Sequence, residues 1–461
     1  MSNSSMARQR LLIQHCRPGM TLIEMLIATT ITLIIMAAVA EVFGLFGAGV
    51  SDSRSVLEMN DQMRAASYRL RQDLAGVTAA TLPPLHPEQE QGYFEYIEGL
   101  GSDANPAAGG LLDAADTTSL TADCDDVLLF TTRSTESPFV GRFTSGLPGS
   151  QLIGTIESPV AEIGWFCRRS PTQVPGGPTL YTLYRRKLLV LGYAGADPFY
   201  SNGNSLDWAT HFSSSWQNFY EQHDVSAHLQ ALNGTVSVVP NTLGDLTKRE
   251  NRFLHFGAFP SSWDTANITG AQVLSGSRLA EDVILTNILA FDVRAFDPHA
   301  PLQVRASGVD AVSPGDPGFD LTSATAARGA YVDLGWNASN FPTVPMDPAT
   351  FPPATGTSVF QTGGVFVSKQ PAQALLTPFT YDTWSSHYET DGIDQNGDGD
   401  TDEGTNGFDD DADDIIDESD ESETSAPYPV ALRGLEIRIR CYEPSSRQVR
   451  QVTVRHTFVP H

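Results

Sequence analysis

The sequence is poor in cysteine and in basic residues. Its 461 residues include 4 cysteines, and 28 Lys and Arg stand against 55 Asp and Glu, which gives a formal net charge of -27. So few cysteines exclude a small scaffold held together by disulfides. The acidic balance argues against a protein that binds nucleic-acid phosphates, so no nucleic-acid partner is expected. With 41% hydrophobic residues, the chain can bury a sizeable core.

Motifs of common catalytic sites are missing as well. The sequence contains no nucleophile elbow, no phosphate-binding loop of the Walker type and no His-Glu-x-x-His motif. The histidines of the body are scattered without metal-ligand spacing: His211, His223, His228, His255, His299 and His387. We therefore expect a protein that is not an enzyme.

The first fifty residues hold a long apolar segment. Met25–Val50 is apolar or small except for Glu41, and Arg8, Arg10 and Arg17 precede it. As a helix it would be about 39 Å long, enough to cross a hydrocarbon core of roughly 30 Å with the arginines on the cytoplasmic side. A secretory signal peptide is cut after its apolar run. Here the small-residue junction lies before the run, so cleavage would leave the helix on the product.

At this junction the chain resembles the type IV prepilin family, which comprises pilins and the pseudopilins of type II secretion. The family pattern is a basic leader ending in Gly, an apolar first mature residue, Glu at the fifth mature position and a long apolar helix. Gly19, Met20 and Glu24 occupy these positions. The resemblance implies that a membrane prepilin peptidase cuts between Gly19 and Met20 and methylates the new amine of Met20.

Glu24 is a carboxylate inside an apolar helix. A charge at bilayer depth costs several kcal/mol unless it is paired. The family resemblance implies that Glu24 neutralises the N-terminal amine of a neighbouring subunit during filament assembly. The alternative is a residue that reaches toward the membrane surface near the helix end.

An amphipathic stalk is expected to follow the membrane segment. Apolar residues recur at three- and four-residue spacing, while Arg64, Arg69, Arg71 and Asp73 lie off the stripe. The stripe consists of Val56, Met59, Met63, Ala66, Leu70, Leu74 and Val77. We expect it to pack against the protein's own sheet and to end at Thr81–Pro84, because proline cannot continue a helix.

Beyond residue 85 the pattern predicts strands separated by clusters of Gly, Pro, Ser and Asn. The clearest runs are Asp126–Thr132, Val160–Cys167, Leu180–Leu191, Val283–Ala295, Ala431–Tyr442 and Gln448–Phe458. The last two would form a hairpin through Glu443–Ser446. In its first strand Leu435, Ile437 and Ile439 alternate with Glu436, Arg438 and Arg440, which predicts one solvent-exposed face.

These elements predict an α+β, pilin-like fold in which a long N-terminal helix packs on an antiparallel sheet. The expected organisation is a leader at 1–19, a transmembrane helix at 20–50, a stalk helix at 51–82 and a β-rich periplasmic head at 83–461. Segments near 192–270 and 296–390 are expected to be loop insertions. Glu41 replaces the proline that major pilins usually carry at the matching position, which argues against a major subunit.

The acidic residues are concentrated near the C-terminus. Residues 391–423 hold 16 Asp and Glu and no Lys or Arg, and residues 391–403 align with 406–418 at an offset of 15. Oxygen ligands at alternate positions of a Gly-bearing loop can converge on Ca²⁺, as in EF-hand and dockerin loops. The candidate structural calcium ligands are Asp394, Asn396, Asp398, Asp400, Asp402, Glu403, Asp409, Asp411, Asp413 and Asp417. The alternative is a solvated acidic linker.

Three cysteines stay with the mature chain, because Cys16 leaves with the leader. Cys124, Cys167 and Cys441 could supply one disulfide in an oxidising periplasm or could all be buried thiols. The sequence leaves both readings open.

The resemblance therefore implies a minor pseudopilin, a structural subunit at or near the tip of a type II secretion pseudopilus. Tyr68–Leu74 is similar to the stalk sequence of the larger minor pseudopilins. Three short later segments are similar to strand patches of the J-type minor pseudopilin and the W-type minor pilin: Leu183–Arg186, Ile288–Arg294 and Pro429–Glu436. The implied partners are the prepilin peptidase, other minor and major pseudopilins and the inner membrane, which the chain would cross once. The alternatives are a minor pilin of a type IV pilus, or a membrane-tethered enzyme or sugar-binding head that uses aromatics such as Trp208, Trp216, Tyr220, Trp263 and Trp384.

Overall fold

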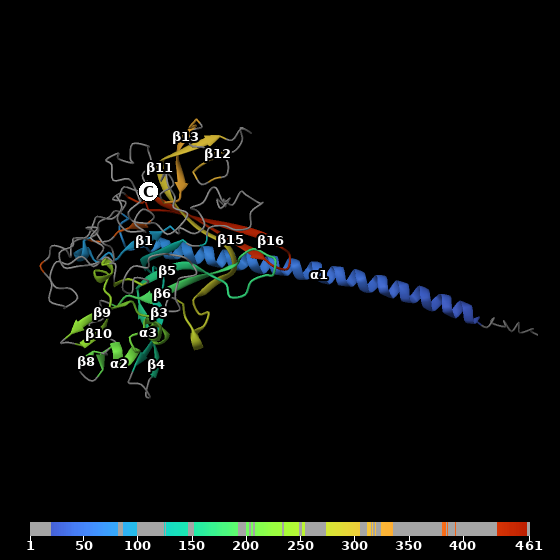
Figure 1. The fold of residues 1–461 in the computed structure, drawn as a ribbon, viewed down its shortest axis with the longest axis horizontal. Coiled ribbons are helices and arrows are strands. Elements are labelled where there is room, and N and C mark those ends of the chain that lie inside the picture. The colour runs from blue at the N-terminus through green and yellow to red at the C-terminus, as the bar shows by residue number, and fades with distance from the viewer. Residues whose placement is uncertain are drawn as a thin grey trace, which may run out of the picture. The chain divides into compact units, whose positions relative to one another are not determined.

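The computed structural model describes most of the chain with gaps. The described residues are 20–81, 86–98, 124, 126–145, 152–191, 200–201, 204–205, 208–232, 235–248, 251–253, 273–304, 311–314, 316, 319, 324–334, 380–383, 385, 392 and 431–458. They fall into two compact units, Met1–Leu57 and Glu58–His461. Helix α1, Leu22–Ala75, runs through both (Figure 1).

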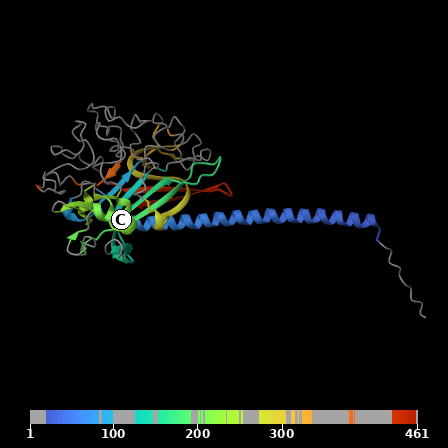
Figure 2. The ribbon, with the colours of Figure 1, turned by 60° about the horizontal axis from the view of Figure 1, so that its bottom comes forward.

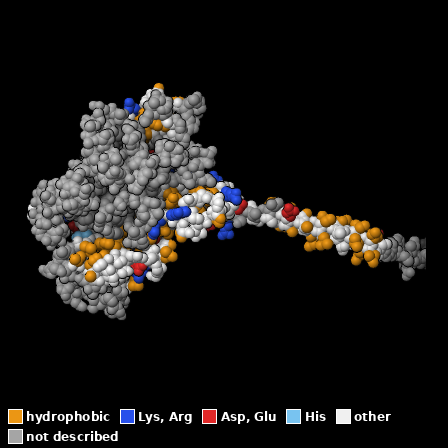
Figure 3. Space-filling view, in the orientation of Figure 1, with side chains coloured by type: hydrophobic (Ala, Val, Ile, Leu, Met, Phe, Trp, Pro, Cys, Tyr) orange, Lys and Arg blue, Asp and Glu red, His pale blue; other side chains and the backbone are white. Residues whose placement is uncertain are grey.

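The first unit is the N-terminal part of α1. Within the described residues, α1 is the single helix long and apolar enough to cross a membrane, over Leu22–Gly44. Its side chains are exposed, and on the face shown in Figure 3 they are mainly hydrophobic. Threonine hydroxyls in this stretch donate hydrogen bonds to backbone carbonyls four residues earlier. Thr30 Oγ1 donates to Leu26 O at 2.6 Å, and Thr32 Oγ1 donates to Ala28 O at 2.7 Å. The helix passes Glu41 without a break.

The second unit is built on a ten-stranded antiparallel sheet in the order β14-β1-β2-β5-β6-β11-β15-β16, with β12 and β13 also paired to β11 (Figures 1 and 2). Its strands are β1 Phe94–Ile97, β2 Val127–Arg133, β5 Val160–Arg169, β6 Tyr181–Leu189, β11 Val283–Val304, β12 Ala311–Val312, β13 Ala327–Val332, β14 Thr380–Asp382, β15 Gly434–Glu443 and β16 Gln448–Thr457. The six predicted strands and the terminal hairpin are confirmed, and the fold is α+β as expected. β11 continues beyond the predicted end at Ala295.

Smaller elements accompany the sheet. They are the pairs β3 Phe139–Ser145 with β4 Leu152–Ser158, β7 Tyr200–Ser201 with β8 Asn204–Ser205, and β9 Ala227–Leu232 with β10 Thr235–Pro240, the helices α2 Trp208–Phe212 and α3 Trp216–Gln222, and 3₁₀ turns at Pro87–Gln89, Asp245–Thr247 and Gly276–Arg278.

The C-terminal part of α1 packs on the sheet through the predicted stripe. Its buried members are Met59, Met63, Ala66, Leu70 and Leu74, each at most 7% exposed and part of the main hydrophobic cluster. This confirms the amphipathic stripe.

Asp73 was expected off this stripe, and that prediction is wrong. Its side chain is 3% exposed and accepts hydrogen bonds from Arg185 Nε at 2.6 Å and Nη2 at 2.8 Å, and from Trp165 Nε1 at 3.1 Å. Trp165 on β5 and Arg185 on β6 are directly paired across the two strands. A bidentate ion pair and an indole donor thus balance the burial of the carboxylate.

The helix also ends earlier than predicted, at Ala75 and not near Thr81. A Cβ at Gly76 would lie 2.2 Å from Arg133 O, so only glycine allows the chain to approach β2 this closely. Val77 then bridges to Thr132, and Thr78 N donates to Thr131 O at 3.0 Å. Hydrogen bonding to the strand, and not the downstream prolines, ends the helix.

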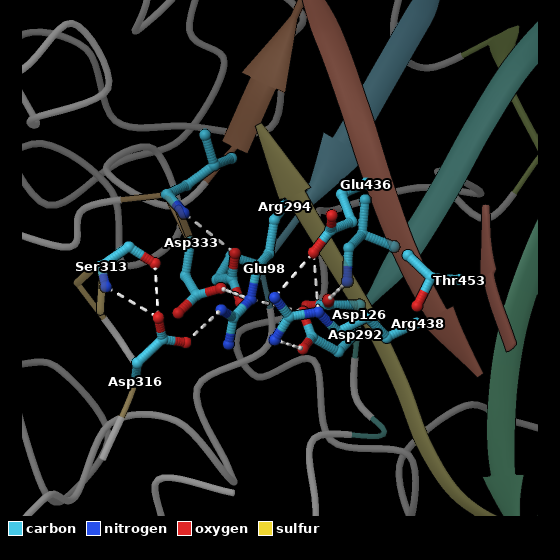
Figure 4. A network of polar contacts seen from close by, with 12 residues as sticks. Glu98, Asp126, Asp292, Arg294, Ser313, Asp316, Asp333, Glu436, Arg438 and Thr453 are labelled. Carbon is cyan, nitrogen blue, oxygen red and sulfur yellow. Dashed lines mark hydrogen bonds and ion pairs between the residues drawn. The ribbon is translucent and has the colours of Figure 1, made fainter. Parts of the chain in front are cut away.

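The polar face of β15 is not exposed as predicted. Glu436 is 1% exposed and Arg440 is 5% exposed. Glu436 binds Arg438 at 2.7 Å (Figure 4), and it also binds Arg455 of β16 at 2.5 Å. Burial would raise the pKa of Glu436, but the two arginines outweigh it and lower that pKa. Nearby, Arg294 of β11 binds Asp292 and Asp333, each at 3.0 Å. These ion pairs compensate for the burial of charged side chains on this face of the sheet.

The described part of 192–270, expected to be a loop insertion, holds helices and strands and contributes to the core. Phe212, Phe219 and Tyr220 are buried, and Trp208 and Trp216 lie with ring centroids 4.7 Å apart. These rings pack against one another and the main cluster. Trp263 and Trp384 lie outside the described residues. A sugar-binding platform on Trp208, Trp216 and Tyr220 is therefore not what the packing favours.

His223 lies in this aromatic cluster. It is 1% exposed, and its ring contacts Phe143, Phe212 and Phe219 with centroids 5.1–5.8 Å apart. Burial lowers the pKa of His223 to about 3. Its Nδ1 accepts a hydrogen bond from Thr144 N at 3.4 Å, as the neutral ring requires.

The Asp73–Arg185 pair gives a stability prediction. In Asp73→Ala, the buried guanidinium loses its partner, so the free energy of unfolding should fall by about 3–5 kcal/mol. The double variant Asp73→Leu with Arg185→Leu should lose less, since no charge is left buried. Urea unfolding of the detergent-solubilised chain measures both, with Arg64→Ala as the control because that side chain is 82% exposed. A loss in Asp73→Ala no larger than that of the control would contradict the assignment.

The His223 environment gives a pH prediction. The unfolded state binds a proton near pH 6.5 and the folded state only near pH 3, so stability is complete above pH 6.5 and is lost as the pH falls toward 3. Between pH 7 and pH 5 the histidine should account for about 2 kcal/mol of lost stability. His223→Asn keeps an acceptor but does not titrate there. Urea unfolding at pH 7 and at pH 5 measures the free energy of unfolding of both proteins. From pH 7 to pH 5 it should fall by about 2 kcal/mol more in the parent than in His223→Asn. An equal fall in both would refute the role of His223.

Candidate functional site

The predicted assembly residue Glu24 caps the start of its own helix. Glu24 Oε2 accepts from Thr21 N at 2.8 Å and from Thr21 Oγ1 at 2.9 Å, while Glu24 N donates to Thr21 Oγ1 at 3.3 Å. This reciprocal pattern is a capping box, in which a Thr at the N-cap and a Glu three residues later satisfy backbone donors that have no partner within the helix. The carboxylate thus has a partner within the chain. The Thr-x-x-Glu spacing is visible in the sequence and could have revealed it.

The remaining residues of the predicted processing site lie next to this cap. Met20 is 70% exposed and precedes the first helical residue, Leu22. Gly19 lies outside the described residues. Cleavage at Gly19–Met20 and methylation of Met20 therefore stay predictions, as does the pairing of Glu24 with a neighbouring amine.

The predicted calcium ligands, from Asp394 to Asp417, also lie outside the described residues. In the part of the chain that the structure describes, no three His, Cys, Asp or Glu side chains are arranged to hold a metal ion. The acidic repeat remains a predicted calcium site.

Buried charges in the head form closed pairs. Arg252 is 0% exposed and binds Asp382 at 2.9 Å and Glu95 at 3.1 Å, with its guanidinium 4.1 Å from the Tyr93 ring centroid. Burial would lower the pKa of Arg252, but the two carboxylates raise it. A substrate cannot reach groups buried this way, so this cluster stabilises the sheet.

Glu162 is a second buried group of this kind. It accepts from Tyr93 Oη and Ser226 Oγ, each at 2.6 Å, and from Phe253 N at 2.8 Å. Burial raises its pKa in spite of these donors. A perturbed carboxyl is a common mark of catalytic sites, but this one is 2% exposed and every contact is to the protein.

The three mature cysteines are free thiols, and all are buried. Cys124 Sγ lies 3.1 Å from Leu289 O. Burial, with the nearby Cys124, raises the pKa of Cys441 to about 12. A thiol with so high a pKa is a poor nucleophile. Because all three cysteines are buried, they pack as small core residues.

Comparison with known proteins identifies one segment. Residues 15–40 match the family described as the prokaryotic N-terminal methylation motif. The match contains Gly19, Met20 and the Thr21–Glu24 capping box. No curated protein and no solved structure matches the chain.

The capping box gives a local prediction. Thr21→Ala removes the hydroxyl that donates to Glu24 and accepts from its amide, so the first helical turn should lose about 1 kcal/mol of stability. Amide hydrogen exchange of residues 22–25 in micelles should become about fivefold faster. Thr29→Ala is the matched control, since Thr29 Oγ1 only bonds helix carbonyls, at 3.0 Å. Equal exchange rates in the two variants would rule out the cap.

Proposed function

We propose that this chain, which is type IV prepilin-like at its N-terminus, is a minor pseudopilin of a type II secretion system, placed at or near the tip of the pseudopilus. The observation that carries the proposal is the order of parts along the chain. The methylation motif at residues 15–40 overlaps an apolar helix long enough for a membrane anchor, and α1 continues into the unit that holds the antiparallel sheet. The motif implies processing by a prepilin peptidase and assembly with other pilins.

The role we assign is structural. Glu24 holds its own helix start in the free subunit and would bind the methylated amine of a neighbour on assembly. Exchange of one partner for another would keep the carboxylate hydrogen-bonded in both states, and the neighbour's amine would also neutralise its charge in the assembled state. The buried arginines Arg185, Arg252 and Arg294 each bind carboxylates within the fold, which fits a scaffold better than a reaction site.

The size of the head supports a minor subunit. Glu58–His461 forms one compact unit, and a head of this size is hard to repeat along a thin filament but fits at its end. We further propose that the head lies in the periplasm, and that Ca²⁺ orders the acidic repeat at 391–423 with an affinity of about 10⁻⁴–10⁻³ M.

Processing is the direct test. In cells that contain a prepilin peptidase, the membrane-extracted protein should begin at a methylated Met20; in cells without it, the protein should begin at Met1. Intact mass and N-terminal sequencing measure this. Gly19→Val should block cleavage, whereas Gly47→Val is the control because a Cβ there would have no atom within 4 Å. Cleavage after the apolar helix, or unchanged mass in both strains, would overturn the proposal.

The alternative is a minor pilin of a type IV pilus, which would be processed in the same way. Cross-linking in cells, followed by identification of the subunits that copurify, distinguishes the two assignments. A minor pseudopilin should copurify with secretion pseudopilins, and a minor pilin should copurify with pilus subunits.

A further inference from the structure

A hollow of about 420 Å³ lies in the second unit beside the end of α1. Its walls come from the last turns of α1, the turn between β2 and β3, and β6. A second hollow of about 390 Å³ adjoins it and shares Ala75, Gly76, Arg133 and Thr135. Together they form an elongated groove around the helix end. Gly76 and Arg133, which line both hollows, lie so close together that a Cβ at Gly76 would clash with the Arg133 carbonyl oxygen.

The first hollow holds more positive than negative charge. Arg69, Arg133 and Lys187 line it, against Asp73 and Glu136, and the second hollow adds Glu90. Asp73 is already bound by Arg185, which does not line the hollow. The nearest carboxylate to Arg69 is that of Asp73 at 3.8 Å, beyond hydrogen-bond distance, and Lys187 Nζ donates to a backbone carbonyl, that of Val140.

The electrostatics agree with this excess. Burial lowers the pKa of Arg69, and the neighbouring Arg185 adds to the effect. Burial likewise lowers the pKa of Lys187, with Arg185 and Arg69 contributing. A bound anion would relieve the repulsion among these cations. In a chain with a net charge of -27, a surface of this sign is unusual.

We propose that this groove binds an acidic segment of another polypeptide, through carboxylates that reach Arg69 and Lys187. The groove's length and lining favour a peptide over a small oxyanion. Tyr68 is 60% exposed and Val140 is 45% exposed beside the cations, so apolar side chains can pack between the charged contacts. Arginine gives a fork that fits a carboxylate.

This inference deepens the proposed function by giving the subunit a contact for a neighbour. It does not depend on processing, because every residue of the groove lies between 68 and 187. A chain that is never cleaved can still be tested for it, so failure of one proposal is separable from failure of the other.

The test is peptide binding to the full-length chain in detergent micelles. The probe is a fluorescent peptide with the sequence of residues 408–417, Phe-Asp-Asp-Asp-Ala-Asp-Asp-Ile-Ile-Asp. Fluorescence anisotropy at low salt should give a Kd that rises at least tenfold in the double variant Arg69→Gln with Lys187→Gln. Arg64→Gln with Arg71→Gln is the matched control, since both side chains are exposed on the same helix outside the groove, and should leave Kd within twofold.

Three results would overturn the inference. They are no binding of the probe, equal binding by both double variants, and equal binding of a peptide with Asn in place of every Asp. Displacement of the probe by millimolar inorganic phosphate at constant ionic strength would show a small-oxyanion site and would also overturn it. Urea unfolding of each variant confirms that a loss of binding is not a loss of fold.

Discussion

The burial of Asp73 is the interaction on which the second unit depends. One carboxylate near the end of a helix accepts two hydrogen bonds from an arginine on β6 and one from a tryptophan on β5. Apolar packing by the stripe from Met59 to Leu74 is non-directional and would tolerate rotation or sliding of the helix. The ion pair has a fixed geometry, so it sets which turn of α1 faces which strands. Packing supplies the attraction, and the buried charge supplies the register.

The same constraint determines where the helix ends and what lies beside it. With Asp73 held against β5 and β6, Gly76 meets the backbone of Arg133, and the chain passes from helical to strand hydrogen bonding within a few residues. Thr81 then meets the start of the C-terminal hairpin, where its carbonyl accepts from Leu432 N at 2.9 Å. One short segment therefore connects α1, the middle of the sheet and the last strands. The groove is a consequence, since Arg69 and Lys187 remain around a carboxylate that another arginine already neutralises.

Glu24, near the N-terminal end of α1, is a carboxylate in a different environment. Glu24 is exposed and accepts its hydrogen bonds from Thr21, so this interaction can be exchanged at small cost. Asp73 is buried and bound by groups that cannot leave without unfolding the head. An exchangeable carboxylate would suit the proposed assembly with neighbouring subunits, and a fixed one suits the architecture of the head.

The sequence by itself determined the features that depend on local pattern. The N-terminal methylation motif, the apolar length of Leu22–Gly44, the stripe of α1 and the strands of the terminal hairpin follow from spacing along the chain, because these patterns are local. Tertiary structure decided the rest. The sequence pattern placed Asp73 and Glu436 on polar faces. Their partners come from other elements, Arg185 of β6 for Asp73 and Arg455 of β16 for Glu436, and local spacing does not predict such contacts. The groove cations come from α1, β2 and β6, so only the folded chain brings them together.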